Sequence, residues 1–457
     1  MSLTTLRRTA FALVLGTTSS AHAGALLDLY GQAQTNDKTL LAAAYQRDAA
    51  LEARPQALAA LLPQVNGQAT YTLQDQNSSY STARFGSPTP VTVTQTNKVD
   101  EHSLSLSLSQ AVFDWAAFTK LKQSDSQMAL AETSYQAARQ DLILRTAQSY
   151  FNVLTASETL RAANAQNAAI GRQLEQSKQR FEVGLSAITD VQDAQARADL
   201  ALAQQLQAES ALSSARRALS QITGLNENTV VPVREDLPLA GPDPMTPDTW
   251  VEAAREGNLA ALAAQLSKTI SDADVRIARA RHLPTVGIQA GYNDTEGDAT
   301  TDGRKSPTSS DGTQIQAILN IPIFAGGATQ SGVRAALAAQ GQRLAEYENA
   351  VRTAERNAGD AYQGVLTGIS TVKAYKAAVT STRTALEASE VGLQVGTRTA
   401  IDVLNAQQQL YAAESNYARS RYDYLTAVLQ LKAAAGRLKE ADLAEIDRLL
   451  IESPAAN

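Results

Sequence analysis

Proline is absent from two long stretches of this chain, and this absence constrains the fold more than any other sequence feature. None occurs from Phe113 to Val231 or from Ile323 to Ser453. Both stretches are rich in Ala, Gln, Leu, Glu and Arg, which favour helices, whereas an internal proline would break one. A single helix from Trp115 to Phe181 would be about 100 Å long at ~1.5 Å per residue. Because so long a helix needs partners along its length, the chain is predicted to be built on long, packed helices.

Apolar side chains recur every seven residues within both stretches. They are Leu121, Met128, Tyr135 and Leu142 in the first stretch and Leu337, Leu344 and Val351 in the second. A seven-residue apolar repeat is typical of helices that pack as coiled coils. The partners of the long helices are therefore expected to be other helices of the same kind.

The two stretches belong to a duplicated unit. The segments 183-VGLSAITDVQDAQ-195 and 395-VGTRTAIDVLNAQ-407 align without a gap at an offset of 212. The same offset relates three further pairs, Tyr150 to Tyr362, Leu154 to Leu366 and Gly224 to Gly436. We therefore expect residues 24–236 and 237–440 to be two structural repeats, followed by a C-terminal helix and tail over residues 441–457.

The duplicated phrase lies near the middle of each helical stretch, where a chain of this length would have to reverse. Gly184 and Gly396 can take the positive φ that ends a helix. Six residues later, Asp190 and Asp402 would lie early in the returning helix. The phrase thus predicts the tip of a helical hairpin, present twice. The alternative is one unbroken helix that tolerates an isolated glycine.

Two runs that alternate in polarity precede each helical stretch. They cover residues 65–73, 102–113, 286–292 and 315–323. In the second run Leu104, Leu106 and Leu108 alternate strictly with serine, as expected for strands with one apolar face. Each run is close to the ~9 to 11 residues that a tilted strand needs to cross a bilayer. The polar segments Gln74–Glu101 and Asn293–Thr313 are predicted to be loops that join the strands in pairs.

Four strands are too few to close a barrel. Open sheet edges are not tolerated in hydrocarbon, so a membrane location requires several chains to share one barrel. Two chains would give eight strands and a filled interior, whereas three would give twelve strands and room for a lumen. The alternative is a soluble, serine-rich sheet packed on helices, because alternating runs of this length also occur in soluble proteins.

The N-terminus carries an export signal. Arg7 and Arg8 precede an apolar stretch, and 21-AHA-23 has the small residues of a cleavage site, so residues 1–23 are predicted to be a signal peptide. Ordinary secretion and a twin-arginine signal are both compatible with this pattern. Removal of Arg7 and Arg8 leaves 38 basic and 46 acidic residues, a net charge of −8, which argues against nucleic-acid binding. With no cysteine, the exported chain has no disulfides and is held by packing.

The sequence offers no catalytic or metal-binding constellation. Only His102 and His282 remain after the signal, and no nucleophile-elbow or phosphate-loop pattern occurs. The run 325-AGGATQSG-332 lacks the lysine of a phosphate loop and is interpreted as a strand-to-helix turn. We therefore expect no enzyme, no cofactor and no metal site.

Several motifs follow one another over nearly the whole mature chain. They are 27-LDLYGQA-33, 57-ALAALLPQV-65, 148-QSYFNVL-154, 180-RFEVGLSAITDVQDA-194, 281-RHLPTV-286, 395-VGTRTAIDVL-404 and 421-RYDYL-425. Together they resemble one known family, the outer-membrane efflux and type I secretion channels. The resemblance implies an α+β membrane protein: a homotrimer whose four strands per chain form a twelve-stranded β-barrel, continued by a long α-helical coiled-coil barrel. A belt of shorter helices, from residues 26–61, 246–280 and the C-terminal helix, is expected around it.

The same resemblance implies a role and partners. A channel of this family lies in outer-membrane lipid, extends into the periplasm and conducts passively. It works with a periplasmic adaptor protein and an inner-membrane pump or ABC exporter in drug efflux or type I secretion. The alternative is a soluble periplasmic coiled-coil adaptor or structural protein, which would also contain helical hairpins but would not need detergent for extraction.

The resemblance assigns functions to the hairpin tips. In the family, polar links close the periplasmic end and aspartates ring the entrance. Matching positions here are Thr189, Asp190, Arg398, Asp402 and, as a further linking arginine, Arg421. The adaptor is expected to dock on Gly184, Leu185, Ser186, Gly396 and Thr397.

Two positions depart from the family pattern. Leu393 replaces a tyrosine that helps closure, and Asn405 replaces the second aspartate of the entrance ring. Asn405 corresponds to Asp193 at the offset of 212, where the family has asparagine. Either the ring charge has moved to Asp193 on the other tip, or Asp193 is an exposed helix residue that faces elsewhere.

Overall fold

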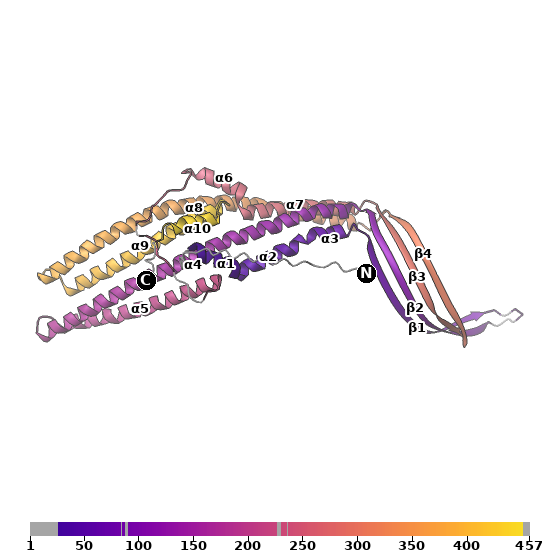
Figure 1. The fold of residues 1–457 in the computed structure, drawn as a ribbon, viewed down its shortest axis with the longest axis horizontal. Helices are drawn as coiled ribbons and strands as arrows, with labels where there is room; N and C mark the ends of the chain where they lie inside the picture. Colours follow the sequence, from indigo (N-terminus) through magenta and orange to yellow (C-terminus); the bar gives the residue numbers. More distant parts are fainter. Residues whose placement is uncertain (1–25, 84, 87–89, 226–229, 235, 451–457) are drawn as a thin grey trace, which may run out of the picture.

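The computed structural model describes residues 26–83, 85–86, 90–225, 230–234 and 236–450 of a long, rod-like chain (Figure 1). The first half contains α1 (Leu26–Asn36), α2 (Lys38–Leu51), α3 (Ala53–Ala59), β1 (Gln64–Thr82), β2 (Val91–Phe113), α4 (Trp115–Glu182) and α5 (Ile188–Thr223). The second contains α6 (Pro247–Gly257), α7 (Leu259–Ala280), β3 (Thr285–Thr301), β4 (Arg304–Asn320), α8 (Ala328–Gln394), α9 (Ala400–Ala434) and finally α10 (Glu440–Asp447). Short helices, two strands and a long hairpin thus occur twice in the same order. The predicted signal peptide lies outside the described residues.

The four strands form one antiparallel sheet in the order β1-β2-β3-β4 at one end of the rod (Figure 1). They contain 19, 23, 17 and 17 residues, about twice the predicted length. The two polar segments predicted to be loops are therefore largely strand, and that prediction is wrong. Asp302 and Gly303 connect β3 to β4 with φ of 48° and 80°, the two positive values of a tight hairpin turn. The Asp-Gly pair is the sequence signal of this turn.

The faces of the sheet differ in polarity near the helices. One face carries apolar side chains from all four strands, Val65, Tyr71, Leu73, Leu104, Leu106, Leu108, Tyr292 and Ile315. The other carries Asn66, Gln68, Ser105, Ser107, Gln289 and Gln316. The apolar band runs from Val65 to Leu73 on β1, about 27 Å along the strand and about 21 Å along a barrel axis at a ~40° tilt. Beyond it the same face bears charged pairs such as Lys98–Asp75 and Lys305–Asp298.

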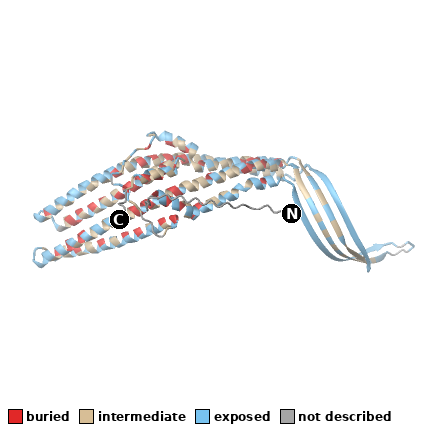
Figure 2. Ribbon diagram, viewed as in Figure 1, coloured by how far each residue is buried: buried red, intermediate tan, exposed pale blue. Residues whose placement is uncertain are grey.

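No described residue of the four strands is buried, whereas buried residues are frequent in the helices (Figure 2). Leu104, Leu106 and Ile315 expose 56%, 52% and 81% of their surface. The outer edges of β1 and β4 have no partner strand in the described part of the chain. Two open edges and an uncovered apolar face are unfavourable for an isolated sheet, so both edges require partner strands and the apolar face requires an apolar neighbour.

The helical rod is built on α4 and α8, of 68 and 67 residues. The prediction of a continuous helix from Trp115 to Phe181 is confirmed, and the Asp114 carboxylate caps its start by accepting from the Ala117 amide. Each long helix turns back into a shorter one, α5 or α9, so the unbroken-helix alternative is excluded. Within the described ranges, no helix combines the length and apolarity that would cross a membrane.

The short helices pack along the long helices of the same chain. Helix α7 packs between α4 and α8 on the side of the rod nearer the sheet. Gln123 of α4 donates to Asp274 of α7 at 2.6 Å, and Gln340 of α8 donates to Asp272 of α7 at 2.7 Å. Helices α2 and α3 lie against α4 in the same part. Within one chain these helices thicken the rod, and a belt around the tunnel of several chains remains a prediction.

Among the described residues, the larger of two clusters of buried apolar residues lies at the middle of the rod and includes residues of α1, α4, α9 and α10. Tyr150, Phe151 and Tyr422 are 0%, 2% and 1% exposed, and the last two rings stack at 5.9 Å. At the edge of this core, Arg145 holds Asp37 through two hydrogen bonds of 3.0 and 3.2 Å. Asp37 is buried and also caps α2 through the Leu40 amide. This ion pair fixes the N-terminal helices to α4.

Candidate functional site

The duplicated phrase forms the two hairpin tips, which lie at the end of the rod opposite the sheet (Figure 1). Gly184 and Gly396 have φ of 75° and 78°, as predicted. The next residues, Leu185 and Thr397, each donate their amide to the carbonyl five residues earlier at 2.8 Å. This glycine turn with its two backbone bonds is a Schellman motif, which satisfies the last carbonyls of a helix. Both tips are therefore closed by the same local chemistry.

The two aspartates of the phrase begin the returning helices. The Asp402 carboxylate accepts from the amide and hydroxyl of Thr399 at 2.9 and 2.8 Å, and Thr399 Oγ1 accepts from the Asp402 amide at 3.2 Å. This reciprocal arrangement is a capping box. Asp190 accepts only from the Ala187 amide, at 3.3 Å, because the alanine side chain has no hydroxyl to donate to the carboxylate or to accept from the Asp190 amide. Helix capping thus explains an aspartate at this position in both copies.

Capping also alters the acidity of one aspartate. Hydrogen bonds from the Thr399 backbone and side chain, with a smaller contribution from the positive charge of Arg398, lower the pKa of Asp402 below its ordinary value. The carboxylate therefore remains charged in mildly acidic solution. A negative charge at a helix N-terminus is favourable for the same electrostatic reason.

The remaining predicted gate residues lie at different depths. Thr189 and Asp193 are exposed in the first turns of α5, and Asn405 is exposed at the corresponding point of α9. Arg398 is exposed between the glycine turn and α9, and Leu393 is half-buried in the last turn of α8. The structure thus gathers all of these residues at the tips.

Arg421 does not belong to this group. It lies about 30 Å along α9 from the start of that helix, at ~1.5 Å per residue, and is only 5% exposed. Its guanidinium lies over the rings of Tyr417 and Tyr422 and donates to the Arg234 carbonyl at 3.3 Å. Across the described part of one chain, no hydrogen bond or ion pair joins Arg398 to Thr189 or Asp190. A link between the hairpins remains a prediction.

Sequence reasoning missed the connection between the two halves. The Tyr150 hydroxyl donates to the Val231 carbonyl at 2.7 Å and accepts from the Val231 amide at 3.0 Å. Its repeat counterpart, Tyr362, donates to the Met245 carbonyl, and Tyr424 donates to the Ala240 carbonyl. The segment between α5 and α6, which connects the two halves, is thus hydrogen-bonded to α4, α8 and α9. The only sequence signal was that Tyr150 and Tyr362 occupy equivalent positions.

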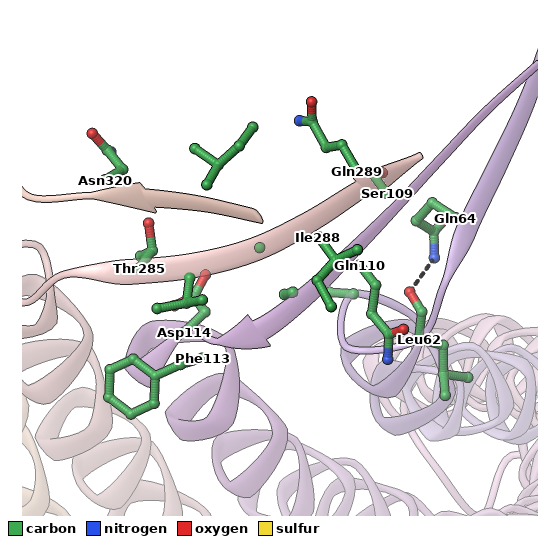
Figure 3. Close-up of a pocket in the computed structure, with 15 residues that line it drawn as sticks. Leu62, Gln64, Ser109, Gln110, Phe113, Asp114, Thr285, Ile288, Gln289 and Asn320 are labelled. Carbon is green, nitrogen blue, oxygen red and sulfur yellow. Dashed lines mark hydrogen bonds between the residues drawn. The ribbon is translucent and has the colours of Figure 1, made fainter. Parts of the chain in front are cut away.

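A pocket lies where the sheet meets the helices (Figure 3). Gln64, which points into this region, donates to the Leu62 carbonyl at 3.3 Å. Asp114 is the one titratable side chain in the lining, and it is engaged as the cap of α4. Among the described residues no group of three His, Asp or Glu side chains is placed to hold a metal. The pocket is therefore interpreted as a gap at the junction between the sheet and the helices.

An uncovered sheet with one apolar face, long coiled hairpins and capped tips define a class of protein, the subunit of a channel made of a β-barrel and a helical tunnel. The outer membrane efflux protein family matches residues 29–225 and 250–437. The outer membrane protein TolC of Vibrio cholerae is 37% identical over 436 residues, 95% of each chain. The chain therefore belongs to the outer membrane efflux protein family, and it is an outer-membrane channel protein.

Two further comparisons agree with this assignment. The alkaline protease secretion protein AprF of Pseudomonas aeruginosa is 29% identical over 442 residues, covering 95% of this chain and 88% of that protein. The crystal structure of the Campylobacter jejuni CmeC outer membrane channel is similar in fold, with a TM-score of 0.73 at 18% identity and coverage of 99% and 98%. By their names, these relatives are an outer membrane protein, a protease secretion protein and an outer membrane channel.

Proposed function

We propose that three copies of this chain close one twelve-stranded barrel in the outer membrane and continue it as a helical tunnel. The sheet carries this proposal, because it has no buried residue among those described, two open edges and one apolar face. Closure of a barrel pairs both edges, places the band from Val65 to Leu73 against lipid and turns the Ser and Gln face to a lumen. Twelve strands leave such a lumen, whereas eight would be filled by their own side chains.

The channel is a passive exit duct. It receives cargo from an inner-membrane pump or ABC exporter through a periplasmic adaptor, in drug efflux, type I secretion or both. We assign no catalytic step to the chain, because the family and the relatives named above carry the names of membrane, channel or secretion proteins. Residues 24–236 and 237–440 are the two structural repeats, each of which contributes one hairpin to the tunnel.

The tips are the adaptor-docking and gating elements. Val183, Leu185 and Val395 expose 68%, 70% and 68% of their surface there, which is unusual for apolar residues without a partner. Polar and charged residues of the tips would close the aperture between hairpins of neighbouring copies. They are Arg398, Thr189, Asp190 and Asp402. Asp402 and Asp193 supply the ring charge in this arrangement.

Assembly is tested by cross-linking in native membranes. We expect a trimer that requires detergent for extraction and resists mild detergent. Cross-linking that stops at the monomer, or release of the chain by buffer alone, would reject the shared barrel and favour a soluble adaptor.

Docking is tested at the glycine turns. Gly184→Trp or Gly396→Trp should abolish efflux while leaving the trimer intact, since the turn both needs a positive φ and faces the partner. Sensitivity to toxic compounds and secretion of proteins are measured side by side in a deletion strain that expresses each variant. Full resistance and full secretion in both variants would argue against docking at the tips.

A further inference from the structure

The two tips differ in where they carry an arginine. At the offset of 212, Arg180 of the first hairpin corresponds to Gly392 of the second, and Ser186 corresponds to Arg398. The carbonyls of Arg180 and Gly392 accept the Schellman hydrogen bond that spans five residues, from the amides of Leu185 and Thr397. The first tip therefore has a large residue before the turn and a small one after it. The second tip has the reverse.

Gly392 leaves space that the Arg398 side chain occupies. A Cβ placed on Gly392 would lie 2.6 Å from Arg398 Cγ, 3.2 Å from Arg398 Cβ and 3.2 Å from Thr397 Oγ1. Carbon atoms in contact are ordinarily ~3.5 to 4.0 Å apart, so an alanine here would have to displace the stem of the arginine. Cγ is close to the backbone, and it cannot move away without a change of rotamer.

The requirement at Gly392 is for space rather than for a special backbone conformation. Gly392 is buried inside the last turn of α8, whereas Gly396 has the positive φ and open space around it. The Gly392 carbonyl also accepts from the amides of Thr397 and Arg398, at 2.8 and 3.1 Å, and from Thr397 Oγ1 at 3.2 Å. Both the backbone and the stem of Arg398 are thus held against this glycine.

We propose that Gly392 is a positioning residue for the gate. By giving room to the Arg398 stem, it fixes the direction in which the guanidinium leaves the turn, so that less rotamer freedom is lost when the charge binds a neighbouring hairpin. The Gly392–Arg398 pair makes the second hairpin the closing one, and the Arg180–Ser186 pair leaves the first hairpin as its target. This inference rests on the proposed gate at the tips.

The test is a cycle of Gly392→Ala, Arg398→Ser and the double variant, measured as open frequency and conductance of single trimers in planar bilayers. We expect each single substitution to favour the open channel by about fivefold, the size of a lost weak interaction. The double variant should match Arg398→Ser alone, because a serine at position 398 has no guanidinium for residue 392 to direct. Alanine favours helix over glycine, so folding is retained.

Controls separate positioning from a general effect on α8. Gly341→Ala makes the same exchange in α8 where a Cβ meets no atom within 4 Å, and it should conduct like the parent. Arg398→Lys keeps the stem and the charge, so it should remain closed when Gly392 is retained and open when it is combined with Gly392→Ala. Native gels of each variant confirm that the trimer is present.

The outcomes distinguish the two hypotheses. If Arg398→Ser conducts like the parent, the proposed gate itself fails. If Arg398→Ser opens the channel but Gly392→Ala does not, the gate stands and the positioning role is overturned. A further opening by Gly392→Ala in the Arg398→Ser background would also overturn it, since the glycine would then act independently of the arginine.

Discussion

Tyr150 binds the segment that connects the two halves more firmly than its repeat counterpart Tyr362 does. Its hydroxyl is fully buried and serves Val231 both as donor and as acceptor, at 2.7 and 3.0 Å. Burial also raises its pKa, so the hydroxyl stays protonated throughout the physiological range. The Tyr362 hydroxyl donates one hydrogen bond to this segment, to the Met245 carbonyl. Tyr150→Phe should therefore lower the free energy of unfolding by about twice as much as Tyr362→Phe does.

The magnitude follows from the number of groups left without a partner. Loss of one such hydrogen bond typically costs ~1 kcal/mol, so we expect about 2 kcal/mol for Tyr150→Phe and about 1 kcal/mol for Tyr362→Phe. A difference of ~2 kcal/mol is a factor of about 30 in a local opening equilibrium. Hydrogen exchange of the Val231 amide should accelerate by up to this factor in Tyr150→Phe.

The assay is hydrogen exchange by mass spectrometry on the detergent-solubilised trimer, with thermal unfolding alongside. Tyr45→Phe is the control, because Tyr45 is 67% exposed. The reasoning is refuted if peptides that contain Val231 exchange at the parental rate in Tyr150→Phe. It is equally refuted if Tyr150→Phe and Tyr362→Phe lower stability by the same amount.

Two further predictions concern charged groups. Arg145→Ala should destabilise the trimer by about 3 kcal/mol at neutral pH, because it leaves Asp37 buried without its cation. Arg139→Ala is the control: it removes the more exposed ion pair with Glu440 and should cost less than ~1 kcal/mol. Burial opposes ionisation of Asp37, yet bonds from Arg145 and the Leu40 amide prevail and lower its pKa. The ion pair therefore stabilises the fold above the ordinary aspartate pKa and loses its effect as pH falls through the lowered pKa. Thermal unfolding is measured from about pH 7 to about pH 3. A loss of stability in Arg145→Ala that stays constant over this range would contradict the argument. Asp402→Ala with Asp193→Ala should remove block by multivalent cations added from the periplasmic side, and block of the parent should persist below the ordinary aspartate pKa, since that of Asp402 is lowered. Complete loss of block in Asp402→Ala alone would show that Asp193 carries no ring charge.

The tips and the long helices were predictable because their determinants are local. The Schellman turns and the capping aspartates involve residues within about six positions of one another, so the phrase around Gly184 and Gly396 is sufficient to specify them. Absence of proline and a regular apolar repeat similarly predict helices without reference to the rest of the chain. The strand-to-helix turn at Gly326 and Gly327 is also confirmed, and both residues have positive φ before α8 begins.

The outer halves of the strands were missed for a related reason. There the apolar alternation of the inner halves ends at Leu73 and Tyr292, and the apolar residues that follow on β2, such as Val93 and Val99, lie on the opposite face. The Asp302–Gly303 turn was the remaining local signal. Its position shows that β3 and β4 continue well past the apolar band before they reverse.

Tertiary structure alone decided which residues of distant segments meet. Arg421 and Arg234 are 187 positions apart, and Tyr150 and Val231 are 81 apart. No pattern within either segment records such a pairing, because it depends on how α4, α8 and α9 pack and on where the connecting segment crosses them. The sequence therefore determined the helices, the turns and the alternation of the inner strand halves through short-range geometry. The placement of α7 between the long helices and the burial of Arg421 were settled only by close packing in three dimensions.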